Sequence, residues 1–198
     1  MLAEFDLIRR YFMSPQEAQA TDGVALGCGD DATLLIPQSG QQLAVSVDTS
    51  VVNVHFPHDA PAHAVGHRAL AVALSDLADM GAVPRWCLMA LTLDQRAFND
   101  DAAAERWLSR YASGFHALCQ QYDTALVGGD VTSGELSIGV TVMGATVPEP
   151  PFGRSMSFNA GWFRMRSDIS PTGTYQRCSP VFMSIAVIRL KGGLKRGR

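Results

Sequence analysis

Four short acidic motifs carry the side chains that could do chemistry in this sequence of 198 residues. They are Gly29-Asp30-Asp31, Ser46-Val47-Asp48-Thr49, Leu74-Ser75-Asp76 and Gly128-Gly129-Asp130. Hard cations such as Mg²⁺ take oxygen ligands, usually one or two carboxylates per ion together with waters and substrate phosphates. Aspartates that meet in one pocket can hold two or more such ions, which neutralise charge during phosphoryl transfer. Together the motifs predict an acidic metal site.

Each motif taken alone has a plainer explanation. An aspartate that follows glycine, as Asp31 and Asp130 do within two residues, often serves only to form a turn. Asp76 could cap or pair locally, although it lies in an otherwise apolar helical pattern where an unpaired charge is costly. Asp48, at the end of a predicted strand, is the hardest to dismiss. Spacing alone therefore leaves the reaction unidentified.

The five histidines add one candidate. His55 is the histidine that we expect near a ligand, and its plainer alternative is an ordinary loop residue. His63 and His67 are one helical turn apart, but there is no HExxH motif, which favours surface or packing roles. The chain has neither GxxxxGK[ST] nor GxGxxG, and no lysine precedes Lys191. P-loop and dinucleotide-binding phosphate cradles are therefore excluded.

The elements that must position these residues alternate along the chain. Residues 23–37 read as strand, acidic turn and strand, and residues 43–52 read as a strong strand. Helical spacing of apolar residues predicts an amphipathic N-terminal helix with one face made by Phe5, Ile8 and Phe12, and long helices before Gly81 and over 99–122. Further strands are predicted at 85–93, 124–130 and 135–148, with possible bulges at Gly139 and Gly144. This order favours an α+β fold (an α/β sandwich) with a mixed sheet and helices on one face.

Charge divides the chain at about residue 148. Residues 1–148 hold 17 acids against 7 arginines, which gives −10, whereas residues 149–198 hold 9 basic residues against 2 acids, which gives +7. We therefore expect a folded domain over 1–148 and an unassigned basic tail over 149–198. An acidic body without lysine argues against nucleic-acid binding, although divalent metals could recruit a polyphosphate. There is no apolar run long enough for a membrane span and no CxxC pair, and a cytoplasmic location is expected.

Several segments of the first 148 residues resemble bacterial thiamine-monophosphate kinases in order and spacing. They are EFDLIRRYF, GDDATLL, LAVSVDTSV, NVHF, HRALAVALSDLADMGA and LVGGD. The resemblance implies the N-terminal domain of the superfamily shared with aminoimidazole ribonucleotide synthetase. It also implies ATP- and Mg²⁺-dependent phosphorylation of thiamine monophosphate to thiamine diphosphate, and a homodimer formed through the sheet of this domain.

The resemblance also implies roles for single residues. Metal ligands would be Asp31, Ser46, Val47 through its carbonyl, Asp48, Asp76 and Asp130. Gly129 and Asp130 would contact ATP, and His55 would meet the thiamine substrate. No residue would act as a covalent catalyst, because the substrate phosphate would attack the γ-phosphorus directly.

The sequence departs from the family pattern at several places. Val131 replaces a usual threonine after the GGD motif, Cys28 replaces an aliphatic residue, and Val47 replaces a common threonine. After residue 148 the family pattern is lost, which a frameshift or truncated reading frame would explain. Two alternatives to an active kinase therefore stay open. One is a homodimerising remnant that binds Mg²⁺ or nucleotide without turnover, and the other is a different ATP-using member of the superfamily.

Overall fold

The computed structural model describes residues 4–13 and 23–146, which lie within a compact unit, Met1–Gly153. The predicted boundary at residue 148 and the predicted basic tail, 149–198, lie outside the described residues. They stay predictions.

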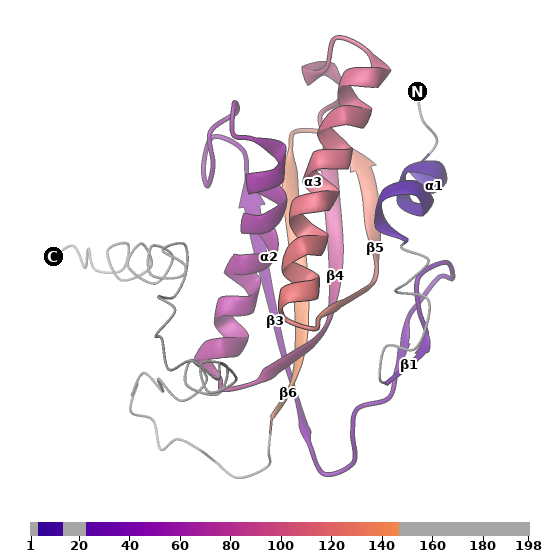
Figure 1. Cartoon of the computed structure of the whole chain (residues 1–198), viewed down its shortest axis with the longest axis vertical. Helices are drawn as coiled ribbons and strands as arrows, with labels where there is room; N and C mark the ends of the chain where they lie inside the picture. Colours follow the sequence, from indigo (N-terminus) through magenta and orange to yellow (C-terminus); the bar gives the residue numbers. More distant parts are fainter. Residues whose placement is uncertain (1–3, 14–22, 147–198) are drawn as a thin grey trace, which may run out of the picture. The chain divides into compact units, whose positions relative to one another are not determined.

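A four-stranded mixed sheet forms the centre of the described fold (Figure 1). Its strands are β3 (Gln42–Val51), β4 (Val83–Leu93), β5 (Ala125–Ser133) and β6 (Ser137–Thr146), in the spatial order β3-β6-β4-β5. β6 pairs antiparallel with both β3 and β4, whereas β4 and β5 run parallel. The parallel pair needs a crossover connection, which contains α3 (Asp101–Gln121) and a short 3-10 turn, η2 (Gln95–Ala97).

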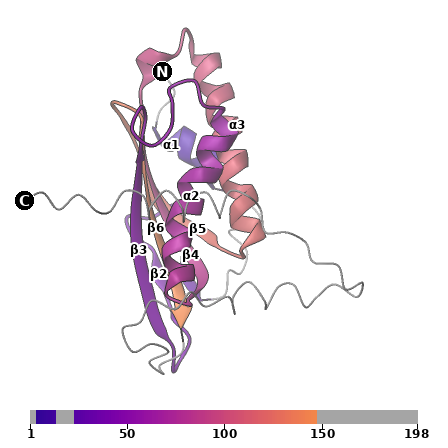
Figure 2. The same cartoon turned by 90° about the vertical axis from the view of Figure 1, so that its left-hand side faces the viewer.

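Two long helices, α2 (Ala62–Asp79) and α3, cover one face of this sheet (Figure 2). The core between helices and sheet is apolar, and Leu70, Phe115 and Val140 are fully buried in it. Asp100 caps α3, because its side chain accepts a hydrogen bond of 2.6 Å from the Ala103 amide. The predicted mixed sheet with helices on one face is confirmed.

The two helices cross at a pair of glycines. A Cβ atom on Gly66 would lie 2.1 Å from the Tyr111 carbonyl oxygen, and one on Gly114 would lie 2.0 Å from the His63 carbonyl oxygen. No side chain fits at either position, so the two backbones are in direct contact. This contact holds α2 close to α3, and α2 carries Asp76 along the sheet.

A small hairpin covers part of the other face of the sheet. It consists of β1 (Val24–Leu26) and β2 (Leu34–Leu35), which are antiparallel, as predicted for residues 23–37. Val24 and Leu35 pack against a buried cluster of Trp86, Ala125, Val127 and Met143. Towards β3 the same face stays exposed, with Leu43, Val45 and Val47 at 42%, 58% and 65% exposure.

The N-terminal helix is less regular than predicted. α1 (Glu4–Leu7) leads into a π-helical turn, η1 (Ile8–Phe12), in which the Met13 amide donates to the Ile8 carbonyl at 3.0 Å. Leu7 and Phe12 are buried and Ile8 is half-buried. The predicted face of Ile8 and Phe12 therefore shifts towards Leu7, because a π-helical turn is wider than the α-helical one that the spacing assumed.

Two details of the strands also differ from expectation. β4 begins at Val83, two residues before the predicted start, so Pro84 lies inside the strand, next to a register shift between Pro84 and Trp86. The β3–β6 register is continuous past Gly139 and Gly144, so neither glycine is an extra bulge residue in that ladder. Gly144 instead lets β6 approach β4 closely, because a Cβ there would lie 2.8 Å from the Val83 carbonyl oxygen.

In the described part of the chain, no helix is long and apolar enough to cross a membrane.

Candidate functional site

One hydrogen bond joins two of the four acidic motifs. The Ser46 hydroxyl on β3 donates to Asp76 Oδ2 on α2 over 2.6 Å, across 30 residues of sequence. Both residues are half-buried. Asp76 is thus satisfied by a partner on the sheet, which explains how a carboxylate is tolerated on a helix whose neighbours Leu74 and Leu77 are buried.

Asp48 lies on the same face of the sheet as Ser46. Side chains alternate along a strand, so Ser46 and Asp48 both face the helices whereas Val47 faces away. The 65% exposure of the Val47 side chain agrees with this alternation. A valine side chain has no metal-binding atom, so any ligand from this position must be the backbone carbonyl.

The GGD motif lies in the second half of β5. Gly129 has φ +151°, and a Cβ there would lie 1.9 Å from the Met89 carbonyl oxygen, so glycine is required. Asp130 pairs in register with Ala90, which pairs with Gly139, which in turn pairs with Thr49. This row lies on the face of the sheet opposite the helices, called the open face from here on. Asp130 is exposed there.

The turn that carries Asp31 is fastened to β5 just before the GGD motif. Cys28 Sγ donates to the Leu126 carbonyl over 3.6 Å, and the Thr33 hydroxyl donates to the Val127 carbonyl. Within the turn, the Asp31 amide donates to Asp30 Oδ1 over 2.9 Å. The first and fourth acidic motifs are therefore neighbours, although about 100 residues separate them in sequence.

His55 is held in a defined orientation beyond the end of β3. Its Nδ1 atom accepts a hydrogen bond of 3.0 Å from the Val51 amide, and its own amide donates to the Val51 carbonyl over 2.9 Å. Asn53, with φ +60°, makes the tight turn between them. Because Nδ1 accepts a hydrogen bond in this arrangement, the neutral ring carries its proton on Nε2, and His55 as a whole is exposed.

The candidate ligands thus form two groups rather than one cage. Ser46, Asp48 and Asp76 lie on the helix-covered side of β3, whereas Asp130 lies on the open face of β5. Three strand spacings, about 14 Å, separate β3 from β5. Within residues 4–13 and 23–146, no three histidine, cysteine, aspartate or glutamate side chains are close enough to hold one metal ion. A single cage formed by this part of the chain alone is therefore not observed.

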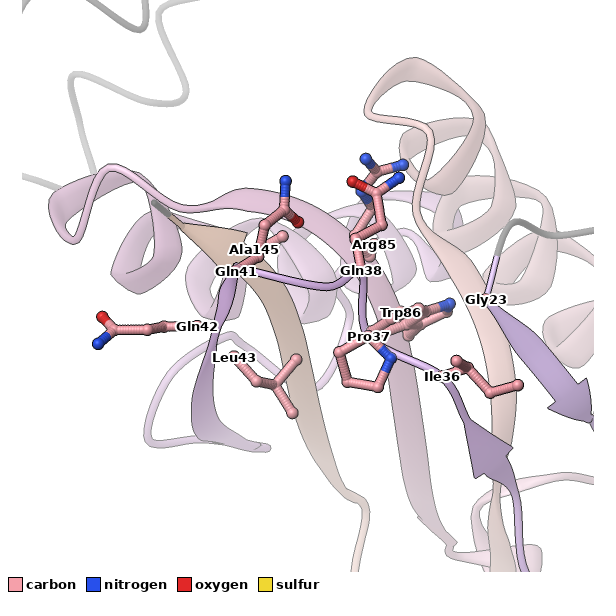
Figure 3. A pocket seen from close by; sticks show the side chains of 10 residues that line it. All are labelled: Gly23, Ile36, Pro37, Gln38, Gln41, Gln42, Leu43, Arg85, Trp86 and Ala145. Atoms are coloured by element: carbon pink, nitrogen blue, oxygen red, sulfur yellow. The ribbon is translucent and has the colours of Figure 1, made fainter. Parts of the chain in front are cut away.

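A small pocket lies away from both groups. Pro37, Gln38, Leu43, Arg85 and Trp86 are among the residues that line it (Figure 3). None of the residues that line it belongs to the four acidic motifs, and Leu43 is three residues, about 10 Å, from Ser46 and faces the other side of the sheet. The pocket is therefore not part of the acidic site.

His63 and His67 on α2 also lie apart from the acidic site. The pKa of His67 is lowered by its burial first and by the charge of His63 second.

Sequence reasoning missed the two residues that fix the Asp31 turn, Cys28 and Thr33. Cys28 was noted as a departure from the family pattern, which was the available signal. Thr33 gave none, because a threonine at the start of a strand fits its β propensity alone. Their carbonyl partners depend on a register shift that cannot be read from the sequence.

The fold and these motifs define a class of protein. Residues 29–146 match the family model described as AIR synthase related protein, N-terminal domain, and the chain belongs to this family.

Within the family, the chain is similar to thiamine-monophosphate kinases. It is 41% identical over 143 residues to the enzyme of Haemophilus influenzae, covering 72% of this chain and 41% of the relative. It is 40% identical over 154 residues to that of Escherichia coli K12, covering 78% and 43%. A crystal structure of thiamine-monophosphate kinase from Stenotrophomonas maltophilia K279a matches with a TM-score of 0.62 and 46% identity, over 74% of this chain and 43% of that one. The chain thus spans about two fifths of the length of these relatives.

Proposed function

We propose that this chain is the metal- and nucleotide-binding part of a thiamine-monophosphate kinase, which uses ATP and Mg²⁺ to form thiamine diphosphate. The observation that carries the proposal is the Ser46–Asp76 hydrogen bond of 2.6 Å. It brings together two motifs of the family resemblance on two different elements, and both side chains supply oxygen atoms, the ligand type that Mg²⁺ prefers.

The donor set fits Mg²⁺ in its chemistry. Ser46, Asp48 and Asp76 offer oxygen atoms on one side of the sheet, and Asp31 and Asp130 offer carboxylates where the first turn meets β5. Mg²⁺ commonly keeps several waters and takes one or two carboxylates along with substrate phosphates, so neither group needs three protein carboxylates. Val47 would contribute its carbonyl. When bound, Mg²⁺ supplies charge neutralisation to the triphosphate.

The residues of this chain would contribute mainly by positioning. Gly129 and Asp130 would hold ATP in the second half of β5, where glycine lets the ligand approach the backbone closely. His55 would orient thiamine monophosphate through its Nε2 proton. A substrate phosphate oxygen held in line could then attack the γ-phosphorus directly while the bond from that phosphorus to the bridging oxygen breaks and ADP leaves, with catalysis from orientation and preorganised charge.

We further propose that two copies associate through the open face of the sheet. Large apolar side chains are exposed there at Leu43, Val45, Val47 and Val83. Exposed contiguous apolar surface on a folded domain typically marks an interaction site.

A second candidate function is binding without turnover. It is supported by the separation of the two carboxylate groups within the described residues. In this case the chain would bind Mg·ATP, but the two groups would not act on one substrate.

One experiment separates these proposals. The purified chain is titrated with Mg·ATP by calorimetry and assayed for thiamine diphosphate with ATP, Mg²⁺ and thiamine monophosphate. Binding with turnover supports the kinase, whereas binding without turnover supports the second candidate. Absence of any Mg²⁺-dependent binding of ATP would contradict both.

A further inference from the structure

The acidic turn that contains Asp30 and Asp31 is attached to β5 at both of its ends. Cys28 precedes the turn and bonds to the Leu126 carbonyl at 3.6 Å, whereas Thr33 follows it and bonds to the Val127 carbonyl. The two acceptors are consecutive carbonyls on one edge strand. The attachment therefore fixes both the position and the direction of the turn along β5.

The acceptor of Thr33 is created by an irregularity in the sheet. Cys87 pairs with Leu126 and Leu88 pairs with Gly128, so Val127 is the extra residue of a bulge in β5. An extra residue has no partner in the ladder, and a buried backbone carbonyl must find a donor elsewhere. Val127 is buried, with 3% exposure. The Thr33 hydroxyl supplies that donor.

The bulge lies directly before the GGD motif. The Thr33 hydroxyl is 3.1 Å from the position that a Cβ on Gly128 would occupy, so it lies against the first glycine of that motif. Asp31 is two residues from Thr33, within about 7 Å of chain, and Asp130 is three residues from Val127, within about 10 Å. One hydrogen bond thus connects two acidic motifs through a few residues on either side.

We infer that Thr33 is a positioning residue that holds the Asp31 turn against the Gly128-Gly129-Asp130 motif, with Cys28 as a second and weaker attachment. The inference rests on the proposed function, because it assigns Thr33 a part in presenting Asp31 and Asp130 to the same Mg·ATP. A thiol is a weak donor, so the hydroxyl carries most of the attachment. Thr33 itself touches neither metal nor nucleotide.

The test uses the full chain and three variants. Thr33→Val keeps the shape of the side chain and removes the hydroxyl, Thr33→Ser keeps the hydroxyl, and Thr141→Val makes the same change on β6 as a control. Hydrogen exchange of amides 29–33 and calorimetric titration with Mg·ATP are measured for each.

The loss of one hydrogen bond to a buried carbonyl should speed exchange in the turn by about five- to tenfold. Weaker alignment of the two carboxylates should lower the affinity for Mg·ATP by a similar factor in Thr33→Val. Thr33→Ser should restore both quantities towards those of the wild type, and Thr141→Val should change neither. Rescue by serine separates a role of the hydroxyl from a role of packing.

Equal exchange rates in the wild type and Thr33→Val would overturn the inference, whatever the binding result. Faster exchange with unchanged affinity for Mg·ATP would also overturn it, because the attachment would then be structural only. If the wild type itself fails to bind Mg·ATP, the proposed function is contradicted and Thr33 has no ligand to serve.

Discussion

At the scale of single residues, the structure gives a physical reason for the least expected carboxylate. Asp76 belongs to a helix whose neighbouring residues are buried, and it is accommodated because Ser46 on β3 donates to it. A polar pair in this position costs stability unless its hydrogen bonds are made, and the Ser46 hydroxyl makes one of them. Asp48, two residues along β3 on the same face, is the natural third member of this group.

We predict that Asp48→Asn abolishes Mg²⁺-dependent binding of ATP and leaves the fold intact. The amide has nearly the same shape but no charge, so the cation loses its electrostatic partner while packing is preserved. Calorimetry with Mg·ATP and thermal unfolding measure the two effects. Asp79→Asn, at the exposed end of α2 and one helical turn from Asp76, removes the same charge at a residue outside the proposed ligand set and should bind as the wild type does. Wild-type affinity in Asp48→Asn would count against the acidic site.

At the scale of elements, most of the secondary structure followed from the sequence because it rests on local patterns. The strand predicted at 43–52 is β3 (Gln42–Val51), and the helix predicted at 99–122 is α3 (Asp101–Gln121). The π-helical turn after Leu7 and the bulge at Val127 could not be predicted. They arise from hydrogen bonds to distant or irregular partners, whereas apolar spacing reports only the ideal period.

The same limit applies to the candidate site. The motif residues were found because oxygen ligands have a recognisable chemistry, and the resemblance gave them an order. Which of them lie together depends on register and on the face of each strand. Asp48 and Asp130 read alike in sequence, yet alternation places one beneath α2 and the other on the open face.

The crossing of α2 and α3 leads to a prediction about stability. A Gly→Ala substitution inside a helix normally raises stability by about 1 kcal/mol. In Gly66→Ala, however, the new Cβ would lie 2.1 Å from the Tyr111 carbonyl oxygen. The helices must separate, which should lower the free energy of unfolding by about 1–3 kcal/mol. Urea unfolding measures the change.

Gly139→Ala is the matched control for this substitution. The nearest atoms to a Cβ on Gly139 are 3.8 Å away, which is ordinary contact, so this variant should be as stable as the wild type or slightly more stable. If Gly66→Ala were equally stable, the direct contact of the two helix backbones would be refuted. Separation of the helices should also displace Asp76 from Ser46, so affinity for Mg·ATP should fall together with stability.

At the scale of the whole molecule, charge and surface point in the same direction. The first 148 residues carry a net −10, from 17 acids and 7 arginines, so a triphosphate could approach their carboxylates only with cations that offset the repulsion. The open face near β3 is apolar instead of acidic, with Val45 and Val47 more than half exposed. The acidic charge of residues 1–148 and the apolar face near β3 are the two features on which the proposed binding of a metal–nucleotide and of a second copy rest.

We predict that Val45→Glu shifts the chain from dimer to monomer. In a symmetric dimer formed through this face, each interface would bury two new carboxylates without partners, which costs several kcal/mol and should raise the dissociation constant at least about 100-fold. Sedimentation over a range of concentrations measures the equilibrium. Val54→Glu introduces the same charge at a residue that is 73% exposed in the turn after β3, outside this face, and should leave association unchanged. A wild-type chain that stays monomeric at all concentrations, or a Val45→Glu variant that associates as strongly as the wild type, would show that the open face is not the contact between copies.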